Sequence, residues 1–321
     1  MFTFAVITYK HERFLVEHLE SIKYQILSFG NGNNHTLLIS DDNSDDRTVE
    51  LADKWIEQNR KLFRETKVVK NSSNMGIVNN YLKTAQEIPT EHFKILAGDD
   101  IYYKNNIYEV LEDYDVVFTP TIAFDQEIIR DEIYREHRLC LKYSNTTKFR
   151  KYLKYKNLIA SPGAFIKLDI LRDSEFRRFL SRYHWIEDLP MWYYLFFKMR
   201  NISYRFETRP YILYRRNVGI SSKQNGARYK EYTLERKRLL EEFGMKLSMF
   251  PKFINPYKYY WKLLNYIVEH FDSKTNPKLI EFESNIQNEL NDSPTYLEFI
   301  RHCAKEFHRK SGVLIDFGES C

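Results

Sequence analysis

Apolar segments with strand character alternate with segments of helical periodicity over the first 120 residues, and this alternation limits the chain to few folds. Residues 2–8 (FTFAVIT) form an apolar run, and apolar residues then recur at helical spacing from Leu15 to Ile26. The signals repeat, with strands predicted at 36–40, 66–69, 93–97 and 115–119 and helices at 48–62, 76–86 and 105–111. Alternating strands and helices of this length form parallel strand pairs with right-handed crossovers. The sequence therefore predicts an α/β fold with a doubly wound, mainly parallel sheet flanked by helices.

Polar residues follow each of the first four predicted strands. They are Thr8 and Tyr9 after the first, Asp41, Asp42, Asn43, Ser44 and Asp45 after the second, Asn71, Asn74 and Gly76 after the third, and Gly98, Asp99 and Asp100 after the fourth. Ligands of such sheets bind outside the carboxyl ends of the strands. Any one loop has a simpler explanation, since Ser44 and Asp45 are ordinary helix-capping residues. Four such loops on one edge favour a binding site.

The fourth loop carries two adjacent carboxylates. Asp99 and Asp100 follow the apolar run 93–97 and Gly98, and two neighbouring anions repel each other unless a cation or water separates them. Mg²⁺ and Mn²⁺ prefer oxygen ligands, so the pair is a candidate metal site. The alternative is an ordinary turn, because Gly and Asp are common turn residues.

A missing motif narrows the kind of ligand. No GxGxxG and no GxxxxGK[ST] pattern follows any predicted strand, so a Gly-rich loop at a helix N-terminus is not the main holder of phosphates. Carboxylates that act through a divalent cation are the other way to neutralise a diphosphate. The sequence therefore favours a nucleotide-diphosphate ligand bound with Mn²⁺ or Mg²⁺.

The second half of the chain contains a candidate general base. In residues 184–196 (HWIEDLPMWYYLF) the adjacent acids Glu187 and Asp188 lie among large apolar residues. Apolar surroundings raise the pKa of a carboxylate, which suits a general base. The alternative is a solvated helix N-terminus, where acidic residues interact favourably with the helix dipole.

Four ordered motifs resemble those of the family 2 glycosyltransferases of the GT-A fold, which transfer sugars from nucleotide-diphospho-sugars with inversion. The motifs are FAVITY at 4–9, LLISDDNSDDRT at 37–48, NMGIVNN at 74–80 and ILAGDDIY at 95–102. By this resemblance Thr8 and Tyr9 flank the nucleotide, and Asp41 pairs with the base, usually uracil. Asn80 would lie near the ribose or the sugar. The expected nucleotide-sugar contacts are Thr8, Tyr9, Asp41, Asp42, Asn74, Gly76, Asn80, Gly98, Asp99 and Arg215.

The resemblance also implies roles for the acidic pairs. Asp99 and Asp100 represent the ribose- and metal-binding element of the family. Many members have an aspartate where this chain has Ala97, so the assignment of the metal ligand between Asp99 and Asp100 stays open. Asp188 is the expected catalytic base, with Glu187 as its neighbour.

The resemblance sets the expected domain organisation. Residues 214–221 (YRRNVGIS) resemble the loop that closes over the donor, in which Arg215 or Arg216 is either a phosphate contact or part of a solvated basic turn. We expect a transferase domain at 1–222, with a nucleotide-binding half (1–120) and an acceptor-binding half (121–222), followed by a C-terminal helical extension (223–321).

The C-terminal extension predicts several helices. A helix rich in Lys, Glu and Arg ends near Phe243, and Leu263, Ile267 and Phe271 then share one face of an amphipathic helix. This face packs against the main domain, lies on a membrane surface beside a lipid-linked acceptor, or forms a homodimer. Packing is the simplest interpretation. Residues 275–321 predict one or two further polar helices.

Composition adds a few limits. The 321 residues, 43% of them hydrophobic, can bury a full core, and 49 Lys and Arg against 44 Asp and Glu argue against a nucleic-acid partner. Cys140, Cys303 and Cys321 lack metal-ligand spacing and predict free thiols in a reducing cytosol. We find no signal-peptide pattern and no run of about 18 apolar residues. A cytoplasmic enzyme is expected, with the inner face of the plasma membrane as an alternative location.

These observations predict a metal-dependent, inverting glycosyltransferase. It would move a sugar from a nucleotide-diphospho-sugar, expected to be a UDP-sugar, to a saccharide or lipid-linked acceptor in bacterial surface polysaccharide synthesis. A catalytically silent binding protein of the same fold is expected to lose Asp188 or the Asp99 and Asp100 pair, and all three are present. A nucleotidyltransferase would normally have a Gly-rich basic loop where this chain has residues 8–11 (TYKH).

Overall fold

The computed structural model describes the chain except residues 33, 111–113, 131–133, 145, 200, 219–226, 245–262, 265, 269 and 314–321. The strands are β1 (Phe2–Thr8), β2 (His35–Asp41), β3 (Glu65–Lys70), β4 (His92–Ala97), β5 (Ile101–Tyr102), β6 (Val116–Phe118), β7 (Thr121–Phe124), β8 (Ile128–Ile129), β9 (Ala164–Ile166), β10 (Tyr204–Phe206) and β11 (Ile212–Arg215). The α-helices are α1 (Leu15–Phe29), α2 (Thr48–Asn59), α3 (Ile77–Glu87), α4 (Tyr134–Tyr143), α5 (Thr147–Tyr155), α6 (Leu168–Arg172), α7 (Ser174–Leu180), α8 (Asp188–Tyr193), α9 (Ala227–Glu242) and α11 (Pro277–Ser311). The 3₁₀ turns are η1 (Arg60–Leu62), η2 (Ile107–Glu109), η3 (Ser161–Gly163) and η6 (Asp272–Lys274), and η4 (Tyr194–Lys198) is a π-helical turn that follows α8.

The first four strands form one parallel sheet in the order β3-β2-β1-β4. Phe2 of β1 pairs with His35 of β2 on one side and with His92 of β4 on the other. Every residue of β1 and β2 is buried, as expected for central parallel strands covered on both faces. The four strands predicted from the first hundred residues, and their parallel pairing, are confirmed.

Two apolar cores lie on opposite faces of this sheet. Phe4 and Val6 of β1 belong to the core that includes Leu19 of α1, whereas Ala5 and Ile7 belong to the core shared with α3 and the second half of the chain. Successive side chains of a strand point to opposite faces, which explains this division. The sheet is therefore the central layer of an α/β fold.

Residues 101–215 add two small sheets, with strand orders β10-β6-β9 and β5-β11-β7-β8. The strand predicted at 115–119 is present as β6. It pairs in parallel with β10 and antiparallel with β9, so it does not extend the main sheet as expected.

The helix predicted at 105–111 is wrong over its described residues. Only the turn η2 forms, and Leu111 lies outside the described part of the chain. The side chain of Gln25 donates a hydrogen bond to the carbonyl of Asn105 at 3.0 Å and a second one to the carbonyl of Tyr103. The carbonyl of Asn105 would otherwise begin the helical hydrogen-bond ladder, so a contact from α1 competes with the helix.

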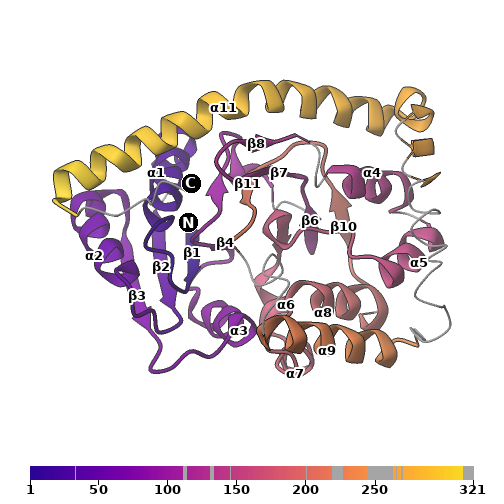
Figure 1. Ribbon diagram of the computed structural model, residues 1–321, viewed down its shortest axis with the longest axis horizontal. Helices are drawn as coiled ribbons and strands as arrows, with labels where there is room; N and C mark the ends of the chain where they lie inside the picture. Colours follow the sequence, from indigo (N-terminus) through magenta and orange to yellow (C-terminus); the bar gives the residue numbers. More distant parts are fainter. Residues whose placement is uncertain are drawn as a thin grey trace.

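The C-terminal helix α11 crosses one edge of the molecule, from α4 past β8 to α1 (Figure 1). Its buried apolar side chains include Leu279, Phe282, Ile286, Leu290, Leu297 and Ile300. The hydroxyl of Tyr296 also donates to the carbonyl of Tyr102 at 2.7 Å. The prediction of one or two further helices is confirmed by one long helix, but this helix is amphipathic rather than simply polar, and its apolar face belongs to the main core.

The amphipathic segment before α11 packs through a different face from the one predicted. Leu264 and Val268 are buried in the main core, whereas Leu263 and Phe271 are exposed at 58% and 62%. Ile267 is also exposed. Adjacent apolar residues at 263–264 and 267–268 give two overlapping apolar stripes, so periodicity alone does not identify the packing face.

Several smaller predictions can also be compared with the structure. Cys140 and Cys303 are free thiols as expected, and Cys321 lies outside the described residues. The charged helix predicted to end near Phe243 is α9. None of the described helices combines the length and the apolar composition needed to cross a bilayer.

Ile286→Ala in α11 is expected to lower the free energy of unfolding by about 2–5 kcal/mol, because it removes fully buried methyl groups and leaves a cavity. Ile280→Ala, on the same helix but 48% exposed, should change it by less than about 0.5 kcal/mol. Urea unfolding followed by circular dichroism measures both. Equal effects at the two positions would contradict the packing of α11 described above.

Candidate active site

A cavity of about 710 Å³ lies at the carboxyl ends of β1 and β4 and extends to α8. The predicted site residues that line it are Thr8, Tyr9, Asp42, Asn74, Gly76, Asn80, Asp99, Asp100, Glu187, Asp188 and Arg215. Asp41 and Gly98 do not line it. The structure thus brings residues from both halves of the chain to one cavity.

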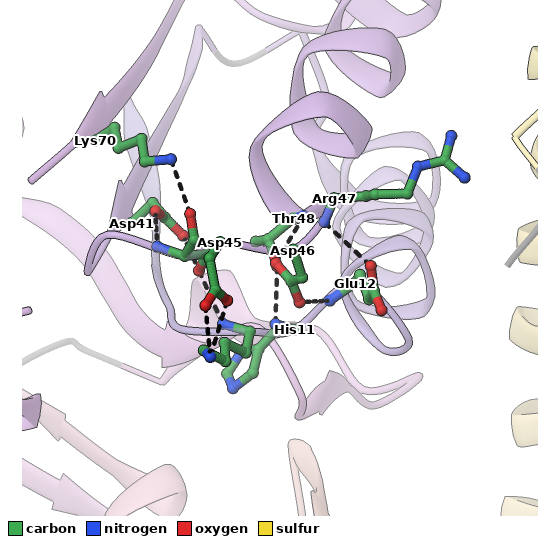
Figure 2. Close-up of polar contacts among 10 residues, drawn as sticks. His11, Glu12, Asp41, Asp45, Asp46, Arg47, Thr48 and Lys70 are labelled. Atoms are coloured by element: carbon green, nitrogen blue, oxygen red, sulfur yellow. Dashed lines mark hydrogen bonds and ion pairs between the residues drawn. The ribbon is translucent and has the colours of Figure 1, made fainter. Parts of the chain in front are cut away.

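The loops after β1 and β2 are joined by hydrogen bonds between residues 34 to 37 positions apart (Figure 2). The backbone N–H of His11 donates to Thr48 Oγ1 at 2.8 Å, and that of Glu12 donates to Asp46 Oδ2 at 3.2 Å. In return, the N–H of Arg47 donates to Glu12 Oε2 at 3.1 Å. These bonds fix the two loops relative to each other beside the cavity.

Lys10 and Asn43, one in each of these loops, have left-handed backbone conformations with φ of +57° and +64°. Such a conformation costs a non-glycine residue about 1–2 kcal/mol. The cost is offset at Lys10 because its N–H donates to Ser44 Oγ at 2.8 Å and its ammonium group pairs with Asp45. Strain at functional loops persists only where surrounding contacts hold it.

Asp41 lies behind Thr8 and is fully buried. Its Oδ1 accepts hydrogen bonds from Thr8 Oγ1 at 3.0 Å and Ser44 Oγ at 2.5 Å, and its Oδ2 accepts the N–H of Ser44 at 2.8 Å. In this arrangement Asp41 orients Thr8, which lines the cavity. Its contact with a nucleotide base stays a prediction.

Asp42 holds the loop that follows β3. Its carboxylate accepts the backbone N–H groups of Met75 at 2.7 Å and Gly76 at 2.9 Å, and the side-chain amide of Asn71 at 3.1 Å. Gly76 has φ +81°, and a Cβ there would lie 2.4 Å from Cε1 of His184. Glycine is required for both reasons, since it allows the left-handed backbone and the close approach of the imidazole ring.

Asn80 lines the cavity from the first turn of α3. Its Oδ1 accepts from Ser40 Oγ at 2.7 Å and from Asn71 Nδ2 at 3.2 Å, and its Nδ2 donates to the carbonyl of Ser40 at 3.1 Å. These bonds fix the side chain between β2 and the loop after β3. The predicted ribose or sugar contact is not tested by them.

The adjacent carboxylates of Asp99 and Asp100 have different surroundings. Asp100 is 2% exposed, and its Oδ1 accepts the backbone N–H of Arg215 at 2.9 Å. Burial, and then the negative charge of Asp99, raise its pKa well above the ordinary range. Asp99 is partly exposed, and its carboxylate makes no hydrogen bond or ion pair with any described residue.

These surroundings fit a divalent cation. The carboxylate of Asp99 can supply an oxygen ligand at the cavity. Asp100 adds a second acidic group, and a nearby positive charge would stabilise the ionised form that burial disfavours. Within the described part of the chain no three His, Cys, Asp or Glu side chains form a ready metal cage. A cation here would complete its shell with phosphate oxygens and water, as Mg²⁺ usually does.

Arg215 is largely buried, and its guanidinium group is already engaged. It donates to Glu17 Oε2 at 2.5 Å and to the carbonyl of Asp99 at 2.8 Å. The group also lies over the ring of Phe14. Arg215 thus holds the acidic turn in place, and its phosphate contact stays a prediction. Residues 219–221 of the predicted donor loop lie outside the described residues.

Glu187 and Asp188 stand at the start of α8. Asp188 Oδ1 accepts the N–H of Leu189 at 2.6 Å, and its Oδ2 accepts from Nδ2 of Asn157 at 2.5 Å. Burial raises the pKa of Asp188, and these donors and the charge of Arg236 oppose the rise. Burial, and then the neighbouring Asp188, raise the pKa of Glu187 to about 8. Glu187 therefore keeps its proton more readily at neutral pH.

The cavity residues that the sequence did not reveal include Asn157, Tyr232, Lys94 and Glu136. Tyr232 belongs to α9, beyond the expected domain end at residue 222. Lys94 is 3% exposed, its Nζ donates to the carbonyl of Ala164 at 2.5 Å, and burial lowers its pKa to about 7. The sequence carried one signal for Lys94, which is a lysine inside the apolar strand 93–97. Burial of an ammonium group costs free energy unless the group is hydrogen-bonded or paired with a negative charge, so a lysine at such a position suggests a specific contact.

The parallel sheet, the acidic turn after β4 and the second acidic pair at α8 are the features of a GT-A type α/β fold in which both acidic pairs line the same cavity. The family model described as glycosyl transferase family 2 matches residues 3–219, which is most of the chain. The chain belongs to glycosyltransferase family 2.

A relative in Mycoplasma genitalium, described as a processive diacylglycerol beta-glycosyltransferase, is 22% identical over 215 residues. The match covers 61% of this chain and 58% of the relative, so the chain spans little more than half of that protein. Among solved structures, S. aureus TarS 1–349 in complex with UDP-GlcNAc has a TM-score of 0.53 at 16% identity, covering 97% of this chain and 90% of TarS 1–349. The same fragment with UDP has a TM-score of 0.52. These likenesses show the fold.

Glu187→Gln is expected to be more stable than the wild type at pH 8, and the difference should shrink towards pH 5. Glu187 loses its proton near pH 4.5 in the unfolded chain and near pH 8 in the folded protein. Between these pH values only the unfolded chain is ionised at this residue, and ionisation stabilises the unfolded state. Wild-type stability therefore falls as the pH rises through this window, and glutamine cannot ionise.

Urea unfolding at pH 5 and pH 8 measures this difference. Glu57→Gln, an exposed position on α2, is the matched control and should show no such pH dependence. A Glu187→Gln difference that is the same at both pH values would contradict the raised pKa.

Proposed function

We propose that the chain is an inverting glycosyltransferase that moves a sugar from a nucleotide-diphospho-sugar to an acceptor hydroxyl. The observation that carries the proposal is the presence of two acidic pairs in one cavity. Asp99 and Asp100 follow a strand of the nucleotide-binding half, and Glu187 and Asp188 begin a helix of the acceptor-binding half. Such a cavity can hold a diphosphate at one end and activate a hydroxyl at the other.

A UDP-sugar is the donor that the comparisons favour. TarS 1–349, which is similar in fold, has a solved structure with UDP-GlcNAc. The chain also lacks the Gly-rich loops that hold phosphates in other nucleotide-binding folds. Both points support a diphosphate neutralised near Asp99 and Asp100.

Asp188 acts as the general base in this proposal. It takes the proton of the acceptor hydroxyl while the hydroxyl oxygen forms a bond to the anomeric carbon of the donor. The bond between that carbon and the diphosphate oxygen breaks, and the nucleoside diphosphate leaves with the electron pair. A single displacement inverts the anomeric centre. Asp188 suits the role better than Glu187, because hydrogen-bond donors favour its ionised form.

A divalent cation belongs to the proposal as a cofactor. Asp99, with Asp100 beside it, would hold Mn²⁺ or Mg²⁺, and the ion would stabilise the negative charge of the leaving diphosphate. The free carboxylate of Asp99 and the buried carboxyl of Asp100 support this role.

The acceptor and the cellular setting are the broader part of the proposal. The acceptor is a saccharide or a lipid-linked molecule in bacterial surface polysaccharide synthesis, and the name of the M. genitalium relative supports a lipid-linked one. The transferase domain spans 1–222, and the helices beyond it provide peripheral membrane contact or a homodimer interface in the cytoplasm. The exposed apolar residues Leu263 and Phe271 support such a surface.

Asp188→Asn is expected to lower turnover by about 10² to 10⁴-fold while UDP affinity stays near that of the wild type. Asparagine keeps the size and hydrogen bonding of the side chain but cannot accept the proton. Hydrolysis or transfer from a panel of UDP-sugars with Mn²⁺ measures the rate, and calorimetry measures UDP binding. Glu187→Gln should lose less activity. Wild-type rates in both variants would refute the placement of the base at α8.

UDP is expected to bind more tightly with Mn²⁺ than in EDTA, and Asp99→Asn should reduce this metal-dependent gain by about tenfold or more. The reason is the loss of a partly exposed carboxylate at the cavity that makes no hydrogen bond or ion pair with the described residues. Asp53→Asn, an exposed position on α2, is the control. Calorimetry that finds equal UDP affinity with and without metal in the wild type would exclude the cofactor role.

A further inference from the structure

Asn157 occupies a position that connects two walls of the cavity. It lies between α5 and η3, 31 positions before Asp188, and both residues line the cavity. Its Nδ2 donates to Asp188 Oδ2 at 2.5 Å. Hydrogen bonds to ionised carboxylates are shorter and stronger than neutral ones, so this contact favours the ionised form of Asp188.

The orientation of the Asn157 amide is set by a second contact. Its Oδ1 accepts the backbone N–H of Ile159 at 3.3 Å, so a rotated amide would place its NH₂ group against that N–H and its oxygen against the carboxylate. The NH₂ group is therefore directed at Asp188. Asp188 Oδ1 accepts the N–H of Leu189 at 2.6 Å, which leaves one lone-pair direction on each carboxylate oxygen for a substrate.

We infer that Asn157 is a positioning residue, whose side-chain amide holds Asp188 as an ionised carboxylate turned towards the acceptor hydroxyl. This inference rests on the proposed function, since it gives Asn157 a task only if Asp188 accepts a proton. The substrate itself is not required to touch Asn157.

Other charged or ionisable groups also face Asp188, and the test must separate them from Asn157. They are Glu187 beside it in the chain, Arg236 and Tyr232 on α9, and Tyr214 on β11. None of them donates a described hydrogen bond to Asp188 from the side chain. Substitution of Asn157 alone leaves them unchanged.

The experiment compares Asn157→Leu, which removes the donor but keeps a side chain branched at Cγ, with Asn157→Asp and Asn157→Gln. Without the amide donor of Asn157, the pKa of Asp188 rises. The acidic limb of the kcat profile should therefore move upward by about one pH unit. Asn157→Asp should move it further through like-charge repulsion, and Asn157→Gln should restore part of the wild-type profile. Rates are measured from pH 5 to 9 with UDP-glucose, UDP-galactose and UDP-GlcNAc in Mn²⁺.

The expected signature is a rate loss that is largest at the acidic end of the range, approaching about tenfold where Asp188 is protonated in both enzymes, and that narrows towards pH 9. A loss by the same factor at every pH, without recovery in Asn157→Gln, would mean a structural role and overturn the inference. Asn288→Leu on α11, an exposed position, is the control for the effect of an Asn to Leu change on folding.

A carboxyl ¹³C titration by NMR, assigned through Asp188→Asn, gives a readout that does not depend on turnover. An upward shift of the Asp188 midpoint in Asn157→Leu, together with the kinetic shift, supports the inference. An unchanged midpoint in an enzyme that turns over UDP-sugars would overturn the role of Asn157 and leave the proposed function intact. A shifted midpoint in a protein that turns over no donor would overturn the proposed function, and the catalytic task of Asn157 with it.

Discussion

The concentration of two adjacent acidic pairs around one cavity is the constraint on which the rest of the site depends. Burial and mutual repulsion raise the pKa of Asp100 and Glu187, so each acidic pair needs donors that the fold supplies. In the first pair, the carboxylate of Asp100 accepts the backbone N–H of Arg215 in β11. In the second pair, the carboxylate of Asp188 accepts the backbone N–H of Leu189 in α8. No residue that the structure describes donates a hydrogen bond to the carboxylate of Asp99 or pairs with it, and this partly exposed carboxylate suits the site to a cation and a diphosphate.

The loops around the cavity are held from several distant elements. The loops after β1 and β2 are joined through backbone N–H groups and short polar side chains, and Asp42 holds the loop after β3 in the same way. Gly76 then packs against His184, and the N–H of His184 donates to Glu235 of α9 at 2.8 Å. A continuous set of contacts therefore joins the donor side of the cavity to the segment that carries Asp188.

The C-terminal helices complete this arrangement. Glu235 accepts the N–H groups of His184 and Trp185, and Tyr232 forms part of the cavity wall. Helix α11 runs along one edge of the molecule (Figure 1). It buries one apolar face there, and its Tyr296 hydroxyl donates to the backbone carbonyl of Tyr102, two residues beyond Asp100. The part of the chain expected to be an extension thus supports the same core and the same site.

The sequence by itself determined the parallel sheet, the edge that carries the polar groups, and the family, because apolar periodicity and strand-end motifs are local properties of the chain. Tertiary structure alone decided which side chains reach the cavity. Asp41 is buried behind Thr8, and Asn157 meets Asp188 across 31 positions. It also decided against a helix at 105–111, where the side chain of Gln25, 80 positions away, donates a hydrogen bond to the carbonyl of Asn105. Hydrogen bonds between residues so far apart leave no local pattern, since each partner is compatible with many environments until the chain has folded.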